Sequence, residues 1–214
     1  TSFAIIVPTS IASVLTHHKF NAVDVDIVKS YGIHVIIGVI FGAIFAASLD
    51  TKSLILFFTT VIYLFAIYLL FIKEKETQIN LKISFLTKVV IGFAVGFISA
   101  PMGIGGAIMN VPILKFFGYS INRAIGSAAA IGFFIAFFGA IGFLILGFLL
   151  KANLPLSIGF INIPAFLIFI PITTIMAKVG ASTVHKIEKK KISKLFGIFL
   201  VIVASKFLYD YFQI

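Results

Sequence analysis

The chain consists mainly of continuous apolar runs about 20 residues long, which is the length that a helix needs to cross the hydrocarbon core of a bilayer. Charged residues make up only 11% of the 214 residues, whereas soluble domains carry about 25%. The alternating apolar and polar pattern of a membrane β-barrel is missing from these runs. The sequence therefore predicts an all-α polytopic membrane protein.

Seven of the apolar runs are expected to be transmembrane helices. They cover residues 1–16, 30–49, 53–72, 84–101, 124–150, 156–177 and 195–212. A shorter apolar piece, 107–117, follows the fourth run. The first run lacks a preceding basic region and a cleavage site, so it does not resemble a signal peptide. Because the first residue is Thr, we expect the protein to continue upstream of Thr1.

The lysines predict an orientation. Residues 178–194 hold six lysines and one acid, Glu188, and so contribute +5 of the formal net charge of +10. Basic loops of membrane proteins collect on the cytoplasmic side, so we expect residues 178–194 to face the cytoplasm. The expected location of the protein is the inner (cytoplasmic) membrane. Alternating crossings would then put 50–52 and 115–123 on the same side and 73–82 outside. A re-entrant glycine stretch is the alternative, and it would change the number of crossings and shift this orientation. Charge of this origin does not indicate a nucleic-acid partner.

An internal repeat is visible. Residues 42–70 resemble 180–208, and residues 1–5 resemble 127–131. Two four-helix repeats are therefore expected, namely 1–72, which lacks its first helix, and 84–214, joined by a loop over 73–83. Eight helices would then form the whole protein, and its substrate site would lie where the repeats meet. Chance similarity between apolar helices is the alternative.

The stretch "SAPMGIGGAIMNVP" (99–112) interrupts the fourth run. Pro101 removes a backbone donor, and Gly103, Gly105 and Gly106 permit dihedrals that other residues avoid. These residues predict that one helix stops and a half-helix begins near Ala107. Its unpaired N–H groups and its dipole would attract an anion. The alternative is a packing device, because small residues let membrane helices approach closely.

Candidate substrate-binding residues follow from this break. The N–H groups of the half-helix start and two nearby polar side chains would bind the anion, and three hydroxyls would lie close to them at the repeat interface. They are Ser99, Gly103, Gly105, Gly106, Ala107 and Asn110, with Thr1, Ser2 and Ser127. His17 and His34 are weaker candidates for binding an ion or a proton.

Enzymatic and metal chemistry lack their usual motifs. The chain has no cysteine, which excludes thiolate metal ligation and covalent haem attachment. It also has no His-Glu-x-x-His motif and no paired carboxylates within the apolar runs. We expect neither an enzyme, nor a cofactor, nor a metal site, and the expected partners are a small anion and the lipid bilayer.

Residues 96–130, "GFISAPMGIGGAIMNVPILKFFGYSINRAIGSAAA", resemble the signature of the TauE/SafE family of membrane proteins. Residues 1–24 resemble the matching stretch of that family's first repeat. Ala107 stands where the family commonly has a third glycine. The resemblance implies an eight-helix carrier that moves sulfite, sulfonates or related sulfur-containing anions. A membrane scaffold or assembly factor without a substrate is the competing hypothesis.

Overall fold

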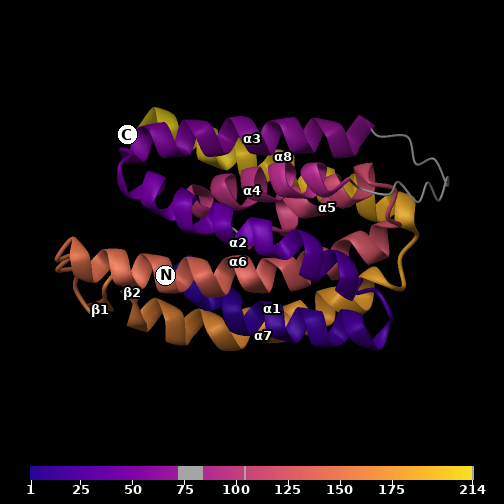
Figure 1. The fold of residues 1–214 in the computed structure, drawn as a ribbon, viewed down its shortest axis with the longest axis horizontal. Helices are drawn as coiled ribbons and strands as arrows, with labels where there is room; N and C mark the ends of the chain where they lie inside the picture. Colours follow the sequence, from indigo (N-terminus) through magenta and orange to yellow (C-terminus); the bar gives the residue numbers. More distant parts are fainter. Residues whose placement is uncertain (72–83, 104, 214) are drawn as a thin grey trace.

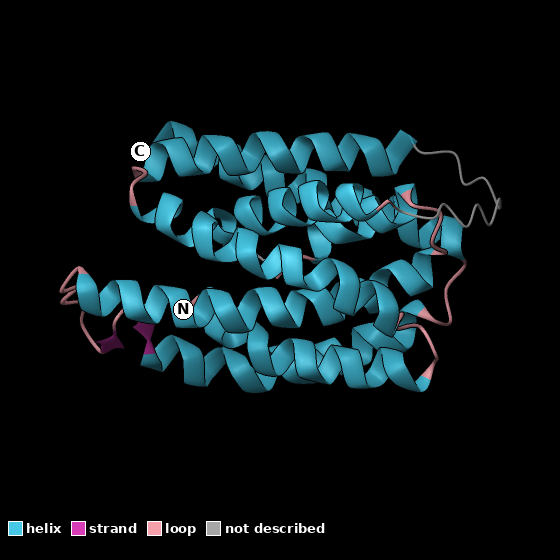
Figure 2. Cartoon of the chain, in the orientation of Figure 1, coloured by secondary structure: helices cyan, strands magenta, loops and turns pink. Residues whose placement is uncertain are grey.

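The computed structural model describes residues 1–71, 84–103 and 105–213, and these residues are almost entirely helical (Figures 1 and 2). The all-α class is confirmed. The helices are α1 (Ser2–Lys19), α2 (Val25–Ala47), α3 (Thr51–Phe71), α4 (Phe85–Met102), α5 (Ala107–Phe116), α6 (Ile121–Leu149), α7 (Ile163–Val184) and α8 (Lys189–Gln213). A two-residue antiparallel pair, β1 (Ser157–Ile158) and β2 (Ile161–Asn162), precedes α7.

Six of these helices are long and apolar enough to cross a membrane, namely α2, α3, α4, α6, α7 and α8. The expected span 1–16 forms α1, which is not one of the six because its last turn holds His17, His18 and Lys19. Two starts also differ from expectation. The helix expected at residue 30 begins at Val25 because the Asp24 side chain caps it, and the helix expected at residue 156 begins at Ile163 after the capping residue Asn162.

The turns gather at two ends of the bundle (Figure 1). Residues 20–24, 117–120 and 185–188 lie at one end, which we call the basic end, and 48–50 and 150–162 lie at the other. Helices α3 and α8 are antiparallel, since Phe58 lies next to Phe207 with ring centroids 4.2 Å apart and Gly197 lies against Leu70. The expectation that 50–52 shares a side with 178–194 is therefore wrong, whereas 115–123 does lie at the basic end.

The reason is the path of α4 and α5. Helix α4 runs inward from the basic end, parallel to α2, because Lys88 reaches Ser30 and Gly96 lies against Val35. After the glycine break the chain turns back, and α5 returns to the basic end (Figure 1). The hairpin α4–α5 thus enters and leaves at one end, which shifts the alternation of crossings by one. The expected outer loop 73–82 and the connecting loop 73–83 lie outside the described residues.

Close helix contacts hold this hairpin in place. A Cβ at Gly96 would lie 2.0 Å from the Val35 carbonyl oxygen, and one at Gly38 would lie 2.1 Å from the Phe93 carbonyl oxygen. Only glycine permits such an approach between α2 and α4, as expected where membrane helices pack through small residues. The hairpin is therefore fixed to α2 along α4.

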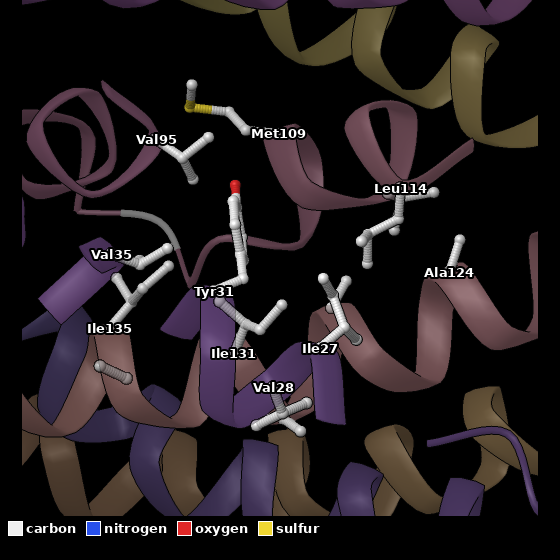
Figure 3. Packing of buried hydrophobic residues seen from close by; sticks show 14 of the residues in the cluster. Ile27, Val28, Tyr31, Val35, Val95, Met109, Leu114, Ala124, Ile131 and Ile135 are labelled. Carbon is white, nitrogen blue, oxygen red and sulfur yellow. The ribbon is translucent and has the colours of Figure 1, made fainter. Parts of the chain in front are cut away.

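The main core joins α2, the hairpin and α6. Figure 3 shows Tyr31 and Val35 from α2 packed with Val95 from α4, Met109 from α5 and Ile131 from α6. A separate apolar cluster lies between α3 and α8. Helix α6 also contacts α1, and α1 contacts α7. The glycine break within the hairpin contacts α1 through Ser2 and Ile6, and it contacts α6 through Gly132 and Ile135.

Candidate functional site

The break has the geometry that its glycines predict. Helix α4 ends at Met102, and Gly103 follows in the left-handed region with φ 61°. Gly106 is also left-handed, with φ 53°, and it is the N-cap of α5, which begins at Ala107. A side chain in this region costs about 1–2 kcal/mol, so glycine is the natural residue at both positions. The predicted stop and restart are confirmed.

The break lies deep in the bundle. A Cβ at Gly132 of α6 would lie 2.6 Å from the Gly105 carbonyl oxygen, so these two backbones touch. Gly132 follows the first residue of α6, Ile121, by 11 positions, which is about 16 Å along the helix axis. Helix α6 is apolar from Ala124 onward and is long enough to span a membrane, so the break lies against its membrane-spanning part. Irregular backbone at that depth must be enclosed by protein or face a watery cavity.

The backbone donors at the break are fewer than the sequence indicates. The Ala107 N–H donates to the Gly105 carbonyl, so the expectation of a free donor at Ala107 is wrong. The left-handed conformation of Gly106 brings that carbonyl within reach. Among the described residues, nothing accepts a hydrogen bond from the N–H groups of Gly105 and Gly106. Two of the three expected donors remain available.

Two polar side chains are buried beside these donors. Asn110 is 0% exposed, and neither its amide nitrogen nor its amide oxygen has a hydrogen-bond partner among the described residues. Its nitrogen lies beside Gly106, 2.8 Å from the position that a Cβ there would take. Ser99 is also buried, and its hydroxyl donates to the Met109 sulfur over 3.7 Å. Since sulfur is a weak acceptor, the hydrogen-bonding capacity of both Asn110 and Ser99 is largely free for a ligand.

The structure places the three remaining candidate hydroxyls, those of Thr1, Ser2 and Ser127, at different sites. Ser2 lies at the break, where its hydroxyl donates to the Gly103 carbonyl over 2.7 Å. Thr1 instead accepts from the Asn162 N–H over 2.8 Å, and Ser127 accepts from the Asp24 N–H over 2.9 Å. The last two hydroxyls therefore anchor the starts of α7 and α2, and only Ser2 touches the break.

One buried polar group escaped the sequence analysis. Tyr31 of α2 is 0% exposed, and its hydroxyl has no hydrogen-bond partner among the described residues. Figure 3 shows this hydroxyl pointing toward Val95 and Met109 of the hairpin. A tyrosine within an apolar helix carries no sequence signal for an unpaired hydroxyl, because burial and partners depend on the neighbouring helices.

No charged side chain belongs to the site as described. In the ranges 1–71, 84–103 and 105–213, no three His, Cys, Asp or Glu side chains gather as metal ligands. The two histidines that do meet, His17 and His185, lie at the basic end with Nδ1 and Nε2 2.9 Å apart. His34 is also close to that end, with its ring nitrogen near the Ser30 carbonyl oxygen. The described residues at the break therefore offer neutral donors.

Comparison with known proteins identifies the family. The profile described as "Sulfite exporter TauE/SafE" matches residues 1–207. The chain belongs to the TauE/SafE family. A protein of Haemophilus influenzae called "Probable membrane transporter protein" is 32% identical to this TauE/SafE chain over 205 residues, which are 95% of the chain and 77% of that protein. No solved structure matches it. The TauE/SafE chain is a multi-pass membrane transporter.

Proposed function

We propose that this chain is a secondary transporter of a small oxidised sulfur anion, such as sulfite or a sulfonate, and that the glycine break is one half of its binding site. The observation that carries the proposal is the unpartnered Asn110 side chain, buried at the N-terminus of α5 next to Gly106. A buried amide without partners costs free energy, so its presence at this place calls for a ligand.

The chemistry of the break fits an oxyanion. The amide nitrogen of Asn110, the hydroxyl of Ser99 and the N–H groups of Gly105 and Gly106 are neutral donors, and the positive end of the α5 dipole adds to them. Oxidised sulfur groups present several acceptor oxygens to such donors. A neutral site also favours release, because it holds the anion without a buried countercharge.

Paired contacts support two related halves, 1–72 and 84–214. Thr1 accepts from the N–H of Asn162, the N-cap of α7, and Ser127 accepts from the N–H of Asp24, the N-cap of α2. These are the equivalent positions of the two repeats, because residues 1–5 match 127–131 and α2 with α3 matches α7 with α8. In inverted-repeat carriers the site lies at the repeat interface, and one repeat moves against the other.

The distribution of positive charge supports a cytoplasmic basic end. Of the 14 Lys and Arg residues in the described ranges, 11 lie within about two helical turns of that end. Lys52, Lys151 and Lys206 are the remaining three. Since cytoplasmic loops carry the excess of basic residues, the hairpin α4–α5 would open toward the cytoplasm.

The test is uptake of labelled anions into proteoliposomes that contain the full-length protein. The panel holds sulfite, a sulfonate, sulfate and phosphate, each with empty vesicles as the control. We expect saturable sulfite or sulfonate flux that competes with the other sulfur anion. Absence of flux above empty vesicles for every anion in the panel would overturn the proposal.

A further inference from the structure

We propose that Met109 is a movable plug, which separates two buried hydroxyls in the present structure and which swings into an adjacent apolar cavity to expose them to the anion. The two hydroxyls are those of Ser99 and Tyr31, so Tyr31 becomes a substrate-contacting residue. This inference rests on the proposed function, because it concerns the same half-site.

The position of Met109 between the two hydroxyls carries the first step. Its sulfur accepts the hydrogen bond of Ser99 over 3.7 Å, and the Tyr31 hydroxyl of α2 points toward the Met109 side chain and Val95 (Figure 3). The Tyr31 ring crosses α4 at Gly92, where an added Cβ would lie 3.4 Å from the ring carbon Cε2. The methionine side chain therefore occupies the place that a ligand of both hydroxyls would need.

Met109 also lines a cavity of about 420 Å³. Helix α3 forms one wall, and the hairpin α4–α5 forms the other. The lining side chains include Val61, Phe65 and Tyr68 of α3 and Ile98, Met109 and Ile113 of the hairpin. Since this lining is almost wholly apolar, a thioether is compatible with it. The structure thus provides a space beside Met109 into which its side chain can rotate.

The energetics favour a methionine for this role. Its three rotatable bonds and polarisable sulfur let it change rotamer within an apolar surrounding at low cost. Leaving its place breaks one weak hydrogen bond to sulfur and exposes the hydroxyls of Ser99 and Tyr31, both otherwise without a strong acceptor. An oxyanion that replaces the sulfur gains two hydroxyl donors in addition to Asn110. The ligand itself therefore supplies the free energy that holds the plug open.

The first experiment follows the methyl group of Met109 by NMR in full-length protein labelled with ¹³C at the methionine methyl carbons. Only Met102, Met109 and Met176 carry such methyl groups in this part of the protein, and a Met109→Leu variant assigns the signal. Saturating sulfite should shift the Met109 signal and leave that of Met176 unchanged, since Met176 is 57% exposed on α7. An unshifted Met109 signal in a sample that demonstrably binds sulfite would overturn the plug.

The second experiment measures uptake by variants. Tyr31→Phe removes only the hydroxyl, and we expect its KM for sulfite to rise about ten-fold without loss of thermal stability. Val61→Phe fills the cavity from α3 and should lower the maximal rate, whereas Ile67→Phe on the lipid-facing side of α3 should not. Wild-type kinetics in both Tyr31→Phe and Val61→Phe would refute the inference. Failure of the wild-type protein to bind or transport any anion would instead refute the proposed function on which the inference rests.

Discussion

Replacing Asn110 by leucine should make the protein more stable and inactive at the same time. Leucine has the same branching and the same number of side-chain heavy atoms as asparagine, so it suits the space within α5. The substitution removes an amide nitrogen and an amide oxygen that are both buried without a partner. Stability and activity are therefore expected to move in opposite directions, which is typical of a binding group that the fold itself does not use.

The magnitude follows from the two unsatisfied atoms. Each buried unpaired polar group costs about 1–3 kcal/mol, and both costs disappear in the leucine variant. Hydrophobic replacements of similar shape cost up to about 1.5 kcal/mol in imperfect packing. We expect a net gain of about 1–3 kcal/mol in the free energy of unfolding. Uptake of sulfite should fall to the level of empty vesicles, because the anion loses a direct donor.

Thr59→Val is the matched control for this prediction. Thr59 is 3% exposed on α3, and its hydroxyl also lacks a partner among the described residues, but it belongs to none of the helices that form the break. Both variants should raise the thermal midpoint in detergent, and only Asn110→Leu should abolish uptake. A loss of more than about 1 kcal/mol in Asn110→Leu would show that the fold satisfies this amide and would refute the reasoning. A stabilised Asn110→Leu variant with normal uptake would favour a packing device in a region that binds nothing.

Three further predictions concern packing, anchoring and pH. Gly96→Ala should destabilise the protein by about 1–3 kcal/mol because its Cβ would overlap the α2 backbone, whereas Gly180→Ala, with open space around the new Cβ, should change stability by less than about 1 kcal/mol in thermal unfolding. Ser127→Ala should cost about 1–2 kcal/mol because the Asp24 N–H loses its acceptor, and Arg123→Gln, which removes an ion pair to Asp24 from a side chain that is 53% exposed, should cost less than about 1 kcal/mol in the same assay. Acidification should destabilise the contact between α1 and α7, because burial and the neighbouring His185 lower the pKa of His17 from 6.5 to about 4, and burial lowers the pKa of His185. Histidines with a lowered pKa favour the neutral form in the fold, so the contribution is complete above about pH 6.5 and is lost as the pH falls toward 4. Thermal midpoints measured from pH 7.5 to 4.5 should therefore fall more steeply in the wild-type protein than in His17→Gln.

The helical class and the position of the break could be predicted from local sequence. Apolar runs determine which segments cross a membrane, and the glycines around residue 105 determine where a helix must stop. The direction of the chain after the break could not be predicted in this way. Gly103 and Gly106 permit a turn, but the contacts of α5 with α6 decide that it returns to the basic end. Because the fourth run and the half-helix were counted as one full membrane crossing, the sequence placed residues 50–52 at the wrong end of the bundle.

The candidate site was predictable in part for the same reason. The sequence predicts that Asn110 and Ser99 lie near the break, because both are close to it along the chain. Only the packing of the helices shows that their polar atoms lack strong partners and could bind a ligand. Ala107 was expected to donate freely, but the tight turn pairs it with Gly105. Tyr31 belongs to a different helix and meets the hairpin only in three dimensions. Thr1 and Ser127 resembled pathway hydroxyls because the sequence does not reveal that they accept hydrogen bonds from the N–H groups of the helix N-caps Asn162 and Asp24.

Helix α6 has 29 residues, which corresponds to about 44 Å along its axis. A hydrocarbon core of about 30 Å is much shorter, so this apolar helix must tilt strongly, extend beyond the core or thicken the bilayer around it. Helix α6 contacts both α1 and α5, and its Gly132 touches Gly105 of the glycine break, so we expect a change in its tilt to alter the break. Vesicles made from lipids of different acyl length should then give different transport rates for the same protein.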